Sequence, residues 1–193
     1  MKTLLTGLFV FAGTLLAPAQ EKKQAPVSAD PPLRIGRVEG RAIVMVQTTG
    51  TMEDAILWRR LKALKPAPLD LSLATGTVAI SWWGLHCDSK LAINFEGIQG
   101  VFKAIGFKTM SLDALGAVSK EKDALVFTVQ GSGQRFRLLN RPKAKGEKSE
   151  PPDLSGEIGK KVEDGTSTFW IAGEVKTGGD LPVIHLAGHA VKD

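Results

Sequence analysis

The stretch that decides the fold lies at residues 76–100 and reads GTVAISWWGLHCDSKLAINFEGIQG. It holds two of the four tryptophans, the only cysteine and one of the three histidines. Residues 77–83 are apolar on both sides of an extended chain, as is typical of a central strand. We interpret the stretch as a core hairpin or strand-to-helix corner, with a turn at Gly84 and a polar bend at 86–88.

Two apolar patterns follow the bend. Leu91, Ile93 and Phe95 alternate with less apolar positions, which predicts a strand with one solvent-facing side. The next apolar residues have helical spacing and predict a short helix that ends near Gly106. They are Ile98, Val101, Phe102 and Ile105.

Upstream of the central stretch, the run RAIVMVQT at 41–48 is bounded by glycines and predicts a buried strand. A helix over 52–65 follows, with a capping box at Thr51 and Asp54 and a stop at Pro66. A proline-rich connection then leads to the next strand. This strand-helix-strand order predicts one crossover unit.

The second half reads as strands joined by turns. A short helix is predicted at 111–118, and a hairpin at 124–139 turns on Gly131-Ser132-Gly133. Residues 140–165 are polar and contain three prolines, which predicts a long mobile loop. A last hairpin over 166–191 either completes the same sheet or forms a small β unit of its own at 166–193.

These elements together predict an α+β fold with a mostly antiparallel sheet of about seven or eight strands and two or three helices. Of the 193 residues, 43% are hydrophobic and 23% are charged, which excludes disorder throughout the chain. We place a single domain at 33–193. The net charge of +5 is spread along the chain and does not indicate a nucleic-acid-binding element.

The first 32 residues have a different character. Lys2 is followed by an apolar run over 4–16 and then by Ala17-Pro18-Ala19, which together indicate a secretory signal peptide at 1–19. The run is shorter than the ~20 residues that cross a bilayer, so no stable membrane span is expected after cleavage. Residues 20–32 predict a disordered tether. The protein is therefore expected to be secreted or periplasmic.

Residues 84–90 (GLHCDSK), with EGIQGV at 96–101, resemble the metal-binding loop of heavy-metal-associated domains. The resemblance implies a ferredoxin-like fold and a soft metal ion held by two cysteines that are separated by two residues. Cys87 matches the first of these positions, but Lys90 stands in place of the second, so half of the thiolate ligands are missing.

A broader metal site would join His86 and Cys87 to His185 and His189, because imidazole and thiolate suit copper or zinc. The two later histidines fall in the predicted strand 181–191. There, residues four apart share a face but lie roughly 13 Å apart. One ion cannot reach both unless Gly188 breaks the strand.

Sequence patterns for a nucleophile elbow, a zinc protease, a phosphate loop and a dinucleotide site are all absent. We therefore expect an exported, non-catalytic binding or assembly domain that needs no cofactor and meets an unknown protein or cell-surface partner. Copper or zinc handling is one alternative. The other is an anionic-surface binder that uses the basic helix 52–65. Its four cations are Arg59, Arg60, Lys62 and Lys65. Aromatic residues make up only 6% of the chain, so specific nucleic-acid binding is not expected.

Overall fold

A computed structural model describes residues 37–76 and 80–192. The strands are β1 (Arg41–Thr48), β2 (Asp70–Gly76), β3 (Ser81–Asp88), β4 (Phe107–Glu121), β5 (Ala124–Val129), β6 (Arg135–Asn140), β7 (Thr168–Lys176) and β8 (Val183–Val191). The helices are α1 (Asp54–Lys62), α2 (Phe95–Lys103) and α3 (Leu154–Glu163). The predicted signal peptide at 1–19 and tether at 20–32 lie outside the described residues.

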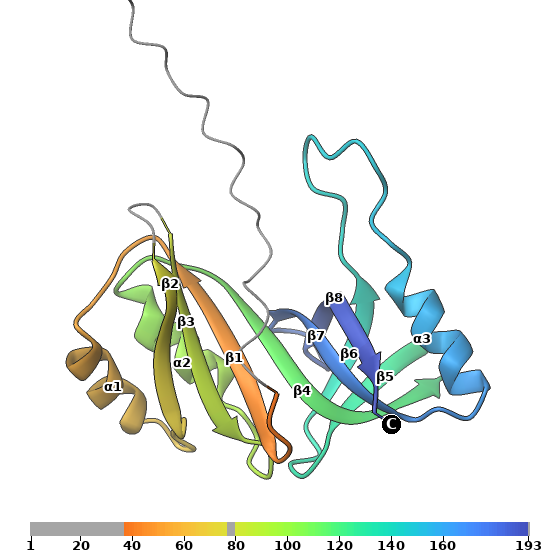
Figure 1. The fold of residues 1–193 in the computed structure, drawn as a ribbon, viewed down its shortest axis with the longest axis horizontal. Coiled ribbons are helices and arrows are strands. Elements are labelled where there is room, and N and C mark those ends of the chain that lie inside the picture. Colours follow the sequence, from red (N-terminus) through yellow and green to blue (C-terminus); the bar gives the residue numbers. More distant parts are fainter. Residues whose placement is uncertain (1–36, 77–79, 193) are drawn as a thin grey trace, which may run out of the picture.

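All eight strands belong to one sheet, in the order β2-β3-β1-β4-β5-β6-β8-β7 (Figure 1). An additional pairing of β4 with β7 closes the second half of this sheet into a barrel. Every strand pair is antiparallel except β6 with β8. The predicted α+β class, the strand number and the mostly antiparallel sheet are confirmed. None of the helices among the described residues is long and apolar enough to cross a membrane.

The first half is a sheet of order β2-β3-β1-β4 with both of its helices on one face. The element order strand-helix-strand-strand-helix-strand is that of a ferredoxin-like unit, and the predicted crossover is its first part. Val44 and Val46 of β1 pack toward the helices, whereas Ile43 and Met45 join Trp82 in a small cluster on the other face. β1 is therefore apolar on both sides, as its sequence predicts.

The second half is a five-stranded barrel of order β4-β5-β6-β8-β7 (Figure 1). Helix α3 lies in the chain between β6 and β7. This connectivity is that of an OB-fold barrel. Strand β4 serves both halves, because its first part pairs with β1 and its last part pairs with β5. Gly116 lies where β4 passes β5. A Cβ there would stand 2.2 Å from the Thr128 carbonyl oxygen, so only glycine fits.

One hydrophobic core runs from the helix-covered sheet into the barrel. Trp83 and Phe102 fill its first part, where their ring centroids lie 6.1 Å apart. Phe127 and Phe136 fill the barrel, and Ile158 of α3 closes the core from outside the sheet. Because the core has no break, the two halves fold as one body.

Polar contacts also join the two halves at the loop before α2. The side chain of Gln134, beside the β5–β6 turn, accepts a hydrogen bond from Ile93 N at 2.9 Å and donates one to Ile93 O at 3.1 Å. The amide of Ser132 donates to Ser89 O at 2.7 Å. These bonds hold the hairpin turn of the barrel against the loop that leads into α2.

The structure corrects the predicted corner in the central stretch. Gly84 and residues 86–88 lie within β3, which is extended throughout, so the predicted turn and bend are wrong. Ile93 and Phe95 are buried, but they lead into α2 instead of forming a strand. The carboxamide oxygen of Asn94 accepts a hydrogen bond from Gly97 N at 2.8 Å, and this cap starts the helix. The helix predicted after Ile98 is confirmed as part of α2.

Four other local predictions can be compared with the structure. The helix expected at 111–118 is wrong because these residues lie in β4 and pair with neighbouring strands on both sides. The loop expected over 140–165 contains α3, whose start is capped by Asp153. The helix predicted at 52–65 is confirmed as α1, but its N-cap is Glu53, without the side-chain cap expected from Thr51. The last hairpin completes the main sheet.

A half-buried ion pair joins Asp113 of β4 to the exposed Arg37. Both carboxylate oxygens of Asp113 lie 3.1 Å from Arg37 Nε, and the guanidinium stacks 5.3 Å from the Trp170 ring centroid. Burial nevertheless raises the pKa of Asp113 above its ordinary 3.8, and the attraction of Arg37 only partly offsets this effect. The ionised carboxylate therefore costs folding free energy at neutral pH, and this cost shrinks as pH falls from the raised pKa toward 3.8.

We predict that Arg37→Ala destabilises the protein by about 1–2 kcal/mol at pH 7, because it leaves Asp113 charged without its partner. Asp113→Asn is expected to be neutral or stabilising. Urea unfolding measured from pH 7 downward should show the Arg37→Ala defect shrinking as Asp113 takes up its proton. The double variant is the control and should match Asp113→Asn. An Arg37→Ala defect that is independent of pH would contradict this interpretation.

Candidate functional site

The structure separates the two metal-ligand candidates of the central stretch. His86 and Cys87 are consecutive on β3, so their side chains point to opposite faces of the sheet. Cys87 pairs with Ala42 and lies in the main core, where it is 7% exposed. Burial raises the pKa of its thiol to about 12, so the thiol is protonated at neutral pH. A protonated, buried thiol is neither a nucleophile nor a metal ligand.

The structure does not bring the two later histidines together either. A register shift opposite Ala172 and Gly173 places Ala187 in a bulge, and this reverses the side-chain alternation between His185 and His189. His189 pairs with the core residue Ile171 and lies against α3, with its Nε2 3.4 Å from Lys161 Nζ, whereas His185 is on the other face of β8. The shared face predicted for the two histidines is therefore wrong.

Nothing gathers these side chains across the sheet. Strands β1, β4 and β7 lie between β3, which carries His86 and Cys87, and β8, which carries the other two histidines. Among residues 37–76 and 80–192, no three histidine, cysteine or acidic side chains are grouped so that they would hold a metal ion.

The cations of the predicted basic helix are on the solvent side of α1 and just beyond its end. Arg59, Arg60 and Lys62 are exposed in the last turn, where the helix dipole favours positive charge, and Lys65 follows the helix. Lys62 Nζ stands 4.6 Å from the ring centroid of Trp58. The buried face of α1 instead carries Leu57 and Leu61.

The other side of α1 forms a groove that sequence reasoning missed. Strand β2 is an edge strand: β3 pairs with one side of it, and no described strand pairs with the other (Figure 1). A groove of about 310 Å³ lies between α1 and this edge. Its lining residues are Asp54, Ala55, Trp58, Asp70 and Leu71. The adjacent Leu69 is 48% exposed, so the edge presents apolar surface to solvent.

The barrel carries two larger grooves of a different character. One, of about 390 Å³, lies beside α3 and is lined by three cations and three acids. Two of these, Lys120 and Glu163, neutralise each other at 2.9 Å. The other, of about 560 Å³, is lined mostly by glycine, threonine and backbone around Gly116. Neither groove has an aromatic lining residue, and the balanced charges of the first do not select a charged ligand.

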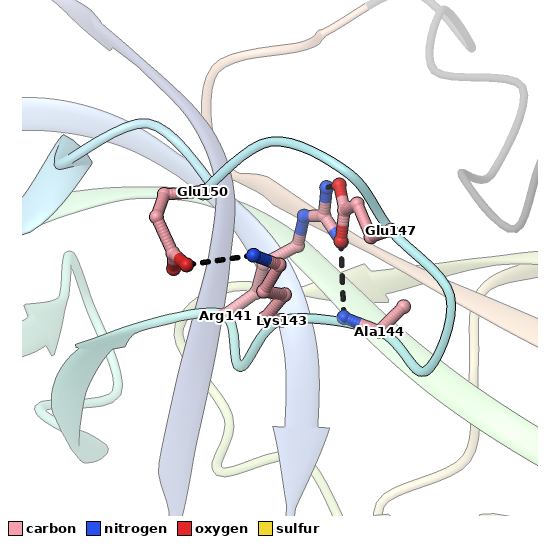
Figure 2. Close-up of polar contacts among 5 residues, drawn as sticks. All are labelled: Arg141, Lys143, Ala144, Glu147 and Glu150. Carbon is pink, nitrogen blue, oxygen red and sulfur yellow. Dashed lines mark hydrogen bonds and ion pairs between the residues drawn. The ribbon is translucent and has the colours of Figure 1, made fainter.

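The connection from β6 to α3 projects from the barrel (Figure 1), and its charged side chains pair with one another (Figure 2). Arg141 donates two hydrogen bonds to Glu147, at 2.6 and 3.1 Å, and Glu147 also accepts from Ala144 N at 3.0 Å. Lys143 pairs with Glu150 at 2.7 Å. These pairs brace the loop, so two of its cations are already neutralised and it does not form a free basic patch.

The groove at the β2 edge had a weak signal in the sequence. Leu69 and Leu71 flank Asp70 after a proline-rich connection, which is an alternation typical of a half-exposed strand. Trp58 lies on the predicted helix, one position after the buried Leu57. The pattern does not say that β2 ends the sheet or that α1 lies beside its open side.

The fold and the groove together define an α+β protein in which a ferredoxin-like sheet shares a strand with an OB-type barrel and leaves one strand edge open beside a helix. No family model, curated protein or solved structure matches this chain.

Proposed function

We propose that this protein is an exported, non-catalytic binding or assembly domain, secreted or periplasmic, whose partner is a protein or peptide that binds at the β2 edge. The observation that carries the proposal is the open strand edge next to an apolar groove. An unpaired strand presents a row of backbone donors and acceptors, and proteins commonly bind extended peptides there. The apolar lining of Ala55, Trp58 and Leu71 supplies surface that a partner can remove from water.

Two further observations support binding over catalysis. The only thiol is buried, and burial raises its pKa to about 12, so covalent catalysis through Cys87 has no activated nucleophile. The three histidines lie on the opposite face of β3 or on β8. Export rests on the apolar run and small residues of the first 19 positions.

The test begins with the full chain expressed in a secreting bacterial host. We expect to find the protein in the periplasm, with the intact mass of a chain that begins at Gln20. Panning this protein against a random displayed-peptide library should enrich peptides that shift the amide resonances of β2 and α1. Leu139, which is 37% exposed on the barrel, provides a reporter that should not move. A library that yields no ligand, or ligands that perturb only the barrel, would contradict the proposal.

A further inference from the structure

We infer that the β2 edge takes an extended peptide segment whose apolar and basic side chains alternate, added as an extra strand beside β2. This inference rests on the proposed function and names the chemistry of the partner. It is carried by three features of the described residues: the open edge, the apolar groove on the helix side, and the acidic side chains at the rim of the groove.

The geometry of β2 separates the two kinds of side chain. Asp70 and Leu71 are consecutive in the strand, so they point to opposite faces. Leu71 packs against the core on the helix side, where Ala55 and Trp58 continue the groove. Alternate side chains of an added strand also point to opposite faces. Those on the helix side would enter the groove and contact apolar atoms, and those between them would lie on the same face as Asp70.

The charge at the groove favours basic residues among the side chains that lie on the Asp70 face. Asp54 and Asp70 are both exposed, and none of the five lining residues is a cation. The cations of α1 lie in its last turn, where Lys62 Nζ stands 4.6 Å from the ring centroid of Trp58. The two carboxylates lie at the other end of the groove lining, in the first turn of α1 and at the start of β2. A carboxylate on an edge strand discourages pairing with acidic or wholly apolar strands, and it favours a strand that brings a positive charge. Asp70 Oδ1 already accepts from Leu71 N at 2.8 Å, which holds this carboxylate close to the strand.

The probes are capped eight-residue peptides that alternate valine with lysine or valine with glutamate. We expect the lysine peptide to bind about tenfold more tightly at low salt, because its cations lie on the same face as the Asp70 carboxylate and Asp54 adds negative charge at the rim of the groove. Methylating the backbone nitrogens of alternate residues tests strand addition, since successive N–H groups point to opposite sides of a strand. One methylated set should lose binding and the other should keep it.

Two pairs of variants locate the site. Asp54→Asn with Asp70→Asn should reduce the lysine preference to less than about threefold, whereas Asp180→Asn, in the distant β7–β8 turn, should leave it at about tenfold. Ala55→Gln fills the groove with a neutral side chain and should weaken binding about tenfold. Ala63→Gln, at the exposed end of the same helix, is its matched control and should have no effect.

The outcomes separate this inference from the proposed function. Four results would overturn the inference of an alternating basic strand. The first two are equal binding of the two peptides and no binding of the lysine peptide. The other two are an equal loss of binding from the two methylated sets and an Ala55→Gln substitution that leaves binding unchanged. Library ligands that bind at β2 but lack basic residues would overturn it as well, and they would leave the proposed function standing. An empty library selection would remove the proposed function itself.

Discussion

Trp83→Ala is expected to lower the free energy of unfolding by about 4 kcal/mol. Trp83 is 1% exposed, packs against Phe102, and donates a hydrogen bond from its indole nitrogen to Thr48 Oγ1 at 3.0 Å. Removing the indole leaves a large cavity at the junction of sheet and helices. Urea unfolding followed by far-UV circular dichroism measures the loss without depending on tryptophan fluorescence.

Two matched variants separate the causes of this loss. Trp83→Phe keeps most of the packing and loses the hydrogen bond, so it should cost about 1 kcal/mol. Trp82→Ala removes the neighbouring indole on the other face, where the cluster among the described residues contains two other buried side chains, Ile43 and Met45. It should cost about 2 kcal/mol, because fewer contacts are lost. A larger loss at Trp82 than at Trp83 would mean that the main core is on the other side of the sheet.

Gly116→Ala is expected to destabilise the protein by about 3 kcal/mol or more, although alanine suits a strand at least as well as glycine does. The added Cβ would stand 2.2 Å from Thr128 O and 2.6 Å from a ring carbon of Phe127. The first atom belongs to the backbone of β5, so relief requires β4 and β5 to separate where the barrel begins. Thermal unfolding with a tertiary probe of the barrel would report the change.

Gly100→Ala is the control for this substitution. Gly100 lies in α2, and a Cβ there would have no atom within 4 Å. Alanine should therefore stabilise the helix by about 1 kcal/mol through its higher helix propensity. If both substitutions had the same sign, the close approach of β4 to β5 would not be the reason for glycine at 116.

Sequence patterns predicted the elements that are determined by residues close to them in the chain. The run at 41–48 is apolar on both faces and forms the central strand β1. The hairpin at 124–139 was predicted from its turn residues and is confirmed by β5 and β6. Prediction failed at 111–118, where alanine and leucine suit a helix but pairing partners exist on both sides. Those partners are distant in sequence, and no local pattern announces them.

The candidate sites show the same division. The candidate ligands could be read from the sequence, but the faces of His185 and His189 depended on whether the last strand is interrupted near Gly188. The bulge at Ala187 reverses the side-chain alternation of this strand and turns His189 toward α3. Conversely, Trp58 and Asp70 carried no motif, and they form a groove only because α1 lies beside the last strand of the sheet.

The sequence by itself determined the class of fold, the buried strands and the basic end of α1, because side-chain periodicity and helix-end chemistry act over a few residues. Only the tertiary structure decided which strand edge stays open and which histidines face inward. Those properties depend on strand pairing between segments such as 111–117 and 168–174, which pairs the other end of the sheet, so that among the described strands β2 keeps one unpaired edge beside its pairing with β3. Pairing over such separations is governed by the shape and burial of the whole sheet.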